Sequence, residues 1–210
     1  MPKLNHKYNL SNSNDVKEII NGCLKKDKKY QKILFENVYS KMVITARRYI
    51  KDAHLAEDVV SDSFLKVLNK INTYNYKGSL NAWISRVVSN TAIDYIRTKK
   101  DFFLTYTNDE CFLKNTHFEY KEFEFENLEE IKGVPSSDVL KEIQNLPPVY
   151  RLIFNMHVFE EMSHKEISKK LDISIGTSKS NLSKAKVRLR KKINNLLLEK
   201  ELKEEIMKQL

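Results

Sequence analysis

The chain has 210 residues, with 37 Lys and Arg against 28 Asp and Glu, a net charge of +9 and a sequence pI near 9.3. This size suits one or two small domains, and the basic charge favours negatively charged partners such as nucleic acid. The chain has no apolar run of 18 residues and no signal-peptide pattern, which argues against membrane insertion or secretion and predicts a cytoplasmic location. Four Gly, four Pro and apolar residues at helical spacing predict an all-α fold.

Cysteine, histidine and carboxylate residues show no pattern typical of a catalytic or metal site. Cys23 and Cys111 have no Cys-x-x-Cys partner and are predicted to be reduced thiols. The five histidines are scattered at His6, His54, His117, His157 and His164. Asp58, Asp62 and Asp94 lack supporting ligands at helical spacing, and no glycine-rich phosphate loop is present. We therefore expect no metal, no cofactor and no catalysis by this chain.

The charge is unevenly distributed along the chain. Residues 1–100 hold 19 basic and 9 acidic side chains, residues 101–138 hold 3 and 10, and residues 139–210 hold 15 and 9. The middle block lacks clean periodicity and ends in Gly133, Pro135 and two serines, which is typical of a linker. The sequence predicts two small helical domains, 1–100 and 139–210, joined by a flexible acidic linker at 101–138.

In the N-terminal block, apolar spacing predicts four or five helices. The first two have ordinary core stripes, namely Val16, Ile19, Ile20, Cys23 and Leu24, then Phe35, Val38, Tyr39, Met42, Ala46 and Tyr49. The third helix, at about 54–71, buries Val60 and Val67 and carries an opposite face made by Asp58, Ser61, Asp62 and Leu65. An exposed leucine among acids suggests a partner, although from the residues alone a solvated acidic face is the ordinary interpretation.

A loop at 72–78 precedes the fourth helix, which is predicted to start at Ser79. Tyr74, Tyr76 and Lys77 in this loop have the side chains that single-stranded nucleic acid needs, because a base stacks on a ring while a cation holds its phosphate. The fourth helix places polar residues on a face that suits a DNA backbone, namely Arg86, Asn90 and Arg97. The only tryptophan, Trp83, falls within the apolar stripe and is predicted to pack in the core.

The stretch 162–192 carries eight surplus positive charges and is predicted to be a helix-turn-helix. Ser163 and Glu166 form a capping box for its first helix, the segment 172–176 breaks that helix, and Thr177 is predicted to cap the second. A buried stripe on the second helix is made by Leu182, Ala185, Leu189 and Ile193. The opposite face, made by Ser180, Ser183, Lys184, Val187 and Lys191, suits a DNA major groove.

Three segments together resemble the bacterial RNA polymerase sigma factors of the extracytoplasmic-function group. They are HLAEDVVSDSFLKVLNKI, GSLNAWISRVVSNTAIDYIR and LPPVYRLIFNMHVFEEMSHKEISKKLDISIGTSKSNLSKAKVRLRKK, in the order of the family. The resemblance implies that 1–100 is a sigma region 2-like domain and 139–210 a sigma region 4-like domain. A member of this family binds core RNA polymerase and directs promoter-specific initiation by reading the minus-35 element and melting the minus-10 element.

The resemblance also implies roles for particular residues. The clamp helices of the polymerase's largest subunit would be bound by Asp58, Ser61, Asp62 and Leu65. Minus-10 DNA would be bound by Tyr74, Tyr76, Lys77, Asn81, Arg86, Asn90 and Arg97. Minus-35 DNA would be bound by Lys179, Ser180, Ser183 and Lys184. The family commonly has Gln and Glu at 61 and 62 and Arg at 181, 184 and 186, so we expect a weaker docking contact and heavier reliance on phosphate contacts and DNA shape.

Further partners implied by the resemblance are the upstream flap region of the polymerase and an anti-sigma factor. The acidic linker would either mimic the charge of RNA in a basic channel or fold back onto the basic domains, and the sequence does not decide between these roles. The alternative function is a free-standing helix-turn-helix transcription regulator. Such a protein would carry a ligand-binding or dimerisation domain in place of an acidic docking helix and an aromatic, basic loop.

Overall fold

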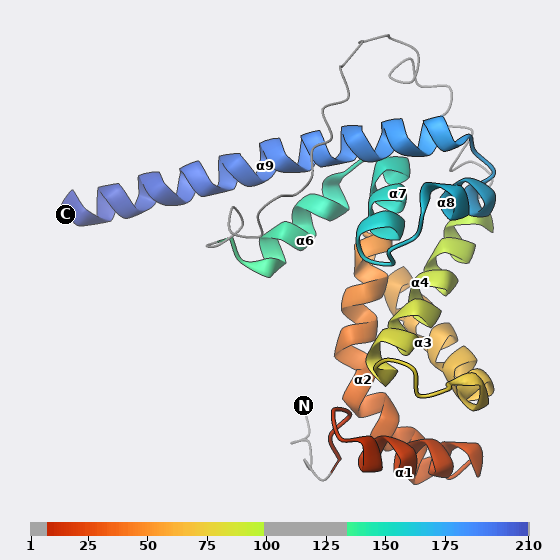
Figure 1. Ribbon diagram of the computed structural model, residues 1–210. Helices are drawn as coiled ribbons and strands as arrows, with labels where there is room; N and C mark the ends of the chain where they lie inside the picture. Colours follow the sequence, from red (N-terminus) through yellow and green to blue (C-terminus); the bar gives the residue numbers. More distant parts are fainter. Residues whose placement is uncertain (1–7, 99–133, 210) are drawn as a thin grey trace. The chain divides into compact units, whose positions relative to one another are not determined.

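The computed structural model describes residues 8–98 and 134–209, and within these ranges all regular secondary structure is helical (Figure 1). The all-α prediction is therefore confirmed. The chain divides into two compact units, Met1–Thr98 and Lys99–Leu210. None of the helices in the described part is long and apolar enough to cross a membrane.

The N-terminal unit is a bundle around one central helix. Its elements are α1 (Ser13–Leu24), α2 (Lys28–Tyr49), α3 (Ala53–Lys70), the short 3-10 helix η1 (Ile71–Thr73) and α4 (Leu80–Thr98). The side chains of Asn12, Asp27 and Asp52 accept hydrogen bonds from backbone N–H groups at the starts of the first three α-helices, which explains where those helices begin. α2 packs against α1, α3 and α4.

The core of this unit comes from the stripes that the sequence predicts, with two exceptions. Ile19, Val38 and Met42 are almost fully buried. Leu24 is 48% exposed because it is the last residue of α1, and Tyr39 is 38% exposed with its ring packed beside Phe35. Assigning these two residues to the core was wrong.

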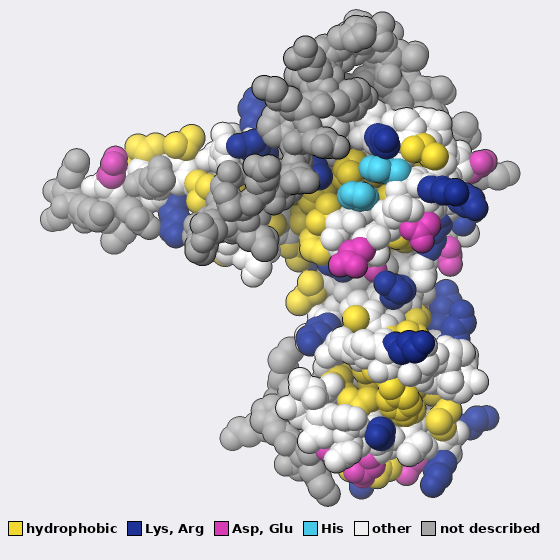
Figure 2. All heavy atoms as spheres, viewed as in Figure 1, with side chains coloured by type: hydrophobic (Ala, Val, Ile, Leu, Met, Phe, Trp, Pro, Cys, Tyr) yellow, Lys and Arg dark blue, Asp and Glu magenta, His cyan; other side chains and the backbone are white. Residues whose placement is uncertain are grey.

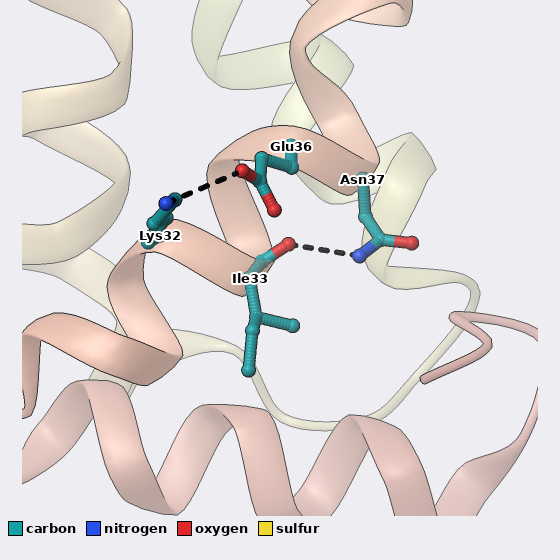
Figure 3. A network of polar contacts seen from close by, with 4 residues as sticks. All are labelled: Lys32, Ile33, Glu36 and Asn37. Carbon is teal, nitrogen blue, oxygen red and sulfur yellow. Dashed lines mark hydrogen bonds and ion pairs between the residues drawn. The ribbon is translucent and has the colours of Figure 1, made fainter. Parts of the chain in front are cut away.

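Two polar contacts of α2 join residues one turn apart within that helix (Figure 3). Asn37 Nδ2 donates to the Ile33 carbonyl at 2.8 Å, and Lys32 Nζ lies 3.9 Å from a Glu36 carboxylate oxygen. An exposed pair one helical turn apart contributes at most about 0.5 kcal/mol. The position of α2 therefore depends on its apolar packing rather than on this ion pair.

Gly22 allows α1 to approach α2 closely. It is buried, and a Cβ at this position would overlap the ring of Tyr30. The hydroxyl of Tyr30 is held in place because it donates to Glu18 at 2.7 Å.

Replacing Gly22 with Ala is therefore expected to lower the free energy of unfolding by about 1–3 kcal/mol, the usual range for overpacking a core. Thermal or urea unfolding of the full chain measures the loss. A matched Gly176→Ala change should be nearly neutral, because the nearest atom to a Cβ there is the Ser174 hydroxyl at 3.6 Å. Equal stability of the Gly22 variant and the parent would contradict the close approach of the two helices.

Within residues 134–209, the described part of the C-terminal unit, there are four helices. They are α6 (Ser136–Asn145), α7 (Pro148–Val158), α8 (His164–Leu171) and α9 (Ile175–Gln209), and α9 continues well past α7 and α8 (Figure 1). α9 packs against α6, α7 and α8. Its buried stripe is the predicted one, made by Leu182, Ala185, Leu189 and Ile193. Pro148 occupies the first turn of α7, where its missing N–H needs no partner.

Two predicted boundaries in this unit differ from the structure. α6 begins at Ser136, so the last three residues of the predicted linker are helical. α9 begins at Ile175 rather than at a Thr177 cap, and the Ser174 hydroxyl oxygen accepts from the Thr177 N–H at 2.9 Å. Gly176 therefore lies inside the first turn of α9 and is not part of the break between the two helices. Asp172, in the left-handed conformation at φ 55°, does end α8.

Candidate partner and nucleic-acid interfaces

One face of α3 is acidic, exposed and carries a leucine. Asp58, Ser61 and Asp62 are exposed and Leu65 is 60% exposed, while the buried side of the helix is made by Ala56, Val59, Val60, Ser63 and Val67. The Ser61 hydroxyl donates back to the Glu57 carbonyl at 3.0 Å. The four predicted docking residues therefore lie together on one accessible face. Asp58 and Asp62 flank Ser61, and Leu65 follows one helical turn later.

Tyr74 lies in the aromatic loop between η1 and α4. Its side chain is only 7% exposed, its hydroxyl donates to the Gly78 carbonyl at 2.8 Å, and its ring centroid lies 5.8 Å from that of Trp83. Burial raises the pKa of Tyr74 above its ordinary value. The ring of Tyr74 is therefore covered and supports the loop, and its predicted contact with minus-10 DNA stays a prediction.

Tyr76 is the exposed ring of this loop. It is 48% exposed and its centroid lies 5.0 Å from that of Tyr74. Its backbone is left-handed at φ 61°, a conformation that costs energy for a residue with a Cβ. The turn is held locally because the Asn75 side-chain oxygen accepts from the Lys77 N–H at 3.1 Å and Gly78 adopts φ 88°. The loop thus presents the ring of Tyr76 beside the exposed Lys77. The buried ring of Tyr74 packs against Tyr76.

The polar face of α4 continues from this loop. Arg86, Asn90 and Arg97 are exposed, and Asn81 is half-buried in the first turn. Trp83 is also half-buried rather than fully enclosed, and it packs against Tyr74. The structure therefore places a cationic strip along α4, with the aromatic loop at its N-terminal end.

The first helix of the helix-turn-helix begins at the predicted capping box. The Ser163 N–H donates to the Glu166 carboxylate at 2.8 Å, and the Ser163 hydroxyl oxygen accepts from the Glu166 N–H at 3.3 Å. α8 and α9 then pack through their buried apolar side chains, including Ile167 and Leu171. The two helices are thereby fixed relative to each other.

On α9 the predicted DNA-reading residues are only partly exposed. Lys179 and Lys184 are exposed, whereas Ser180 and Ser183 are half-buried, and the Ser180 hydroxyl donates to the Thr177 carbonyl at 3.1 Å. Asn181 is only 1% exposed and faces the core. The lysines are therefore the most accessible of the predicted groups on this face. The side chain of Asn181 is buried and cannot contact a DNA base from this position.

The structure brings together two histidines that the sequence analysis treated as scattered. His157 at the end of α7 and His164 at the start of α8 stack with ring centroids 4.6 Å apart. The seven-residue spacing crosses an irregular turn, so no periodic signal in the sequence indicates this pairing.

No group of His, Cys, Asp or Glu that could hold a metal ion occurs in the described residues. Cys23 is free and buried, and burial, followed by the charge of Asp27, raises the pKa of its thiol to about 11. Cys111 and most of the predicted acidic linker lie outside the described residues.

Comparison with known proteins identifies both units. Residues 34–102 match the Sigma-70 region 2 family and residues 136–189 match the Sigma-70, region 4 family. The chain is 30% identical over 140 residues to the ECF RNA polymerase sigma factor SigM of Bacillus subtilis, covering 67% of this chain and 80% of SigM. It is 26% identical over 153 residues to SigW of the same organism, covering 71% and 81%.

Among solved structures, the chain is similar to the sigma factor RpoE of Bartonella quintana, crystallised with the anti-sigma factor NepR. The TM-score is 0.42 at 20% identity, covering 78% of this chain and 96% of that one. Both sigma regions occur in family order, and the alignment with SigM covers two thirds of this chain. The chain belongs to the family of ECF RNA polymerase sigma factors.

Proposed function

We propose that this sigma factor, which directs promoter recognition, divides its work among three surfaces: α3, the loop before α4 together with α4, and α9. We assign 1–100 to polymerase docking and minus-10 melting, 139–210 to minus-35 recognition, and 101–138 to the connection between them. The observation that carries the proposal is that each matched sigma region exposes charged side chains suited to its partner. The first exposes acidic residues on α3 and an aromatic, basic loop, and the second exposes lysines on α9. Co-elution of the purified chain with core RNA polymerase tests it, and separate elution of the two would remove it.

The docking surface comprises Asp58, Ser61, Asp62 and Leu65, and its partner is the clamp helices of the largest polymerase subunit. Two carboxylates give orientation and fast association, and one exposed leucine gives apolar area that is lost from water only in the complex. Ser61 is already bonded to its own helix, so it contributes a small contact. The short side chains at 61 and 62 support a closer, smaller interface than longer residues would make.

For minus-10 melting, the exposed ring of Tyr76 is the base-stacking group and Lys77 is its phosphate partner. Unpairing a base costs a few kcal/mol, and stacking on an aromatic ring recovers about 1–3 kcal/mol of this. The ring of Tyr74 packs against Tyr76, and Trp83 packs against Tyr74. The separated strand then continues along the polar face of α4, where the contacts are made by Asn81, Arg86, Asn90 and Arg97.

For minus-35 recognition, α9 enters the major groove with Lys179, Ser180, Ser183 and Lys184. The lysines are exposed, whereas the serines are half-buried and one is already hydrogen-bonded to the backbone. Phosphate contacts by the lysines therefore supply most of the affinity, and DNA shape supplies much of the selectivity.

Replacing Lys184 with Ala is expected to reduce the slope of log Kobs against log salt concentration by about 0.9, the contribution of one phosphate contact. The slope is obtained by measuring promoter binding of the reconstituted holoenzyme at several salt concentrations between about 50 and about 200 mM. A matched Lys141→Ala change on the exposed side of α6 should leave it unaltered. An unchanged slope in the Lys184 variant would count against phosphate-dominated readout.

Further partners follow from the same family. The C-terminal domain would contact the upstream flap region of the polymerase, and an anti-sigma factor would act by covering the docking or DNA-binding surfaces. Because core polymerase supplies the chemistry, the chain itself acts without catalysis or cofactor, in the cytoplasm where the chromosome is transcribed. A free-standing regulator is not favoured, since the N-terminal half matches sigma region 2.

A further inference from the structure

Two histidines lie face to face at the helix-turn-helix. His157 belongs to the last turn of α7, His164 is the first residue of α8, and their rings stack with centroids 4.6 Å apart and an interplanar angle of 12°. His157 Nδ1 lies 2.9 Å from the Met162 carbonyl oxygen, and His164 Nδ1 lies 2.9 Å from the hydroxyl oxygen of buried Ser178. Both rings are half-buried, and Figure 2 shows two histidine side chains together at the surface of the C-terminal unit.

The groups that act on His164 disfavour a positive charge on its ring. Burial has the largest effect, followed by His157 from α7 and then by Lys179 and Lys186 from α9, and together they lower the pKa of His164 below its ordinary value. On its own helix, the Glu166 carboxylate is engaged in the capping box. In the free protein near neutral pH the pair is therefore uncharged at His164.

The hydrogen bonds of the pair tolerate an added proton. His157 donates its Nδ1–H to a carbonyl oxygen whether its ring is neutral or protonated. The Ser178 hydroxyl can donate to or accept from the neutral His164 ring, depending on its tautomer, and can accept from the protonated ring, so the bond is available in either state. The obstacle to protonation of His164 is thus its burial together with the nearby positive charges, and not the loss of a hydrogen bond.

We propose that His164, stacked on His157 and bonded to Ser178 beside Lys179, couples promoter binding to proton uptake: DNA phosphates that approach Lys179 and Lys186 allow its ring to take up one proton. This inference rests on the proposed minus-35 function of α9. Lys179 belongs to the predicted DNA-reading set, so phosphates that neutralise it also remove part of the repulsion on His164. By linkage, if DNA makes the proton bind more tightly, the proton makes DNA bind more tightly by the same factor.

In the protein without DNA, acidification has the opposite effect, because it lowers the free energy of unfolding. Because the folded pKa of His164 is lowered, the unfolded chain binds more protons, and stability is lost as pH falls below the ordinary histidine value of about 6.5. DNA-bound protein should escape this loss. Acidification therefore weakens the free C-terminal unit and strengthens its promoter complex.

The test compares promoter affinity of reconstituted holoenzyme at two pH values. Between pH 7.5 and 6.0, the affinity of holoenzyme with the unaltered chain should rise more than with His164→Gln, by a factor that stays below about threefold, the low-pH limit for a shift of about half a pKa unit. The same comparison with His54→Gln, an exposed histidine of α3, should show no difference, and core polymerase contributes equally to all three. Matching pH profiles for the unaltered and His164→Gln chains would overturn the coupling.

A second readout keeps the test decisive if His164→Gln folds poorly. NMR titration of the histidine rings in the full, unaltered chain should show the His164 midpoint move to higher pH when a minus-35 duplex is added. An unmoved midpoint with DNA bound would overturn the coupling and leave the sigma function standing. Holoenzyme that shows no chain-dependent promoter binding at either pH would instead refute the proposed function itself, and the coupling with it.

Discussion

Replacing Asp58 or Asp62 with Lys is expected to weaken the affinity for core RNA polymerase about tenfold each, and about a hundredfold in combination. Both carboxylates are exposed on α3, so their replacement removes no contact within the folded unit. The loss would come from like-charge repulsion at an interface that the acidic face is proposed to orient. Binding of the purified variants to core polymerase, followed by anisotropy of a labelled chain, measures the affinity.

The control for these charge reversals is Glu36→Lys on α2. This residue is also an exposed acid of the N-terminal unit, and its ion pair with Lys32 is a surface contact of small energy. It changes net charge by the same amount as either single reversal. Equal weakening by Glu36→Lys would show that overall charge, and not the α3 face, governs the interaction.

Leu65 provides a second, uncharged test of the same face. Its side chain is 60% exposed, so Leu65→Ala should leave the midpoint of thermal unfolding nearly unchanged. Affinity for polymerase should fall, because the leucine is the apolar part of the proposed contact. Unaltered polymerase binding by this variant would place the docking surface elsewhere.

Replacing Tyr76 with Ala is expected to reduce open-complex formation about tenfold, because stacking of one base on an aromatic ring is worth about 1–3 kcal/mol. The side chain is 48% exposed, so the change should cost little folding stability. Tyr76→Phe keeps the ring and should retain most of the activity. Promoter opening is measured by the reactivity of unpaired bases at the minus-10 element.

Two further comparisons separate base capture from other effects of Tyr76→Ala. On a template whose minus-10 strands are already mismatched, the variant should recover part of its deficit, because part of the unpairing cost no longer has to be met. Tyr74→Ala should instead lower the thermal stability of the N-terminal unit, since Tyr74 is buried and bonded to Gly78. Normal opening by Tyr76→Ala on duplex DNA would remove Tyr76 from the melting step.

The parts of the fold that the sequence predicts correctly are those governed by local chemistry. The capping box at Ser163 and Glu166 and the apolar stripe of α9 each depend on residues within a few turns of one another. The error at the start of α9 has the same origin: Ser174 and Thr177 are both hydroxyl residues three positions apart, and either is a plausible cap.

The parts that the sequence does not predict depend on contacts between elements. Tyr74 and Tyr76 are alike in a loop without periodicity, and only the packing of Trp83 determines which ring is covered. The burial of Asn181 and the stacking of His157 on His164 likewise depend on how α7, α8 and α9 pack. Spacing along the chain therefore predicts which helix carries a site, and tertiary packing decides which side chains reach its surface.

Reconstituted transcription tests the central claim most directly. Core RNA polymerase is combined with a library of promoter sequences, with and without this chain, and the start sites of the RNA products are read. We predict that the chain gives initiation at a defined set of promoters sharing minus-35 and minus-10 elements, and that the chain carrying both Asp58→Lys and Asp62→Lys does not. Initiation that is equally efficient and equally placed without the chain would contradict the account.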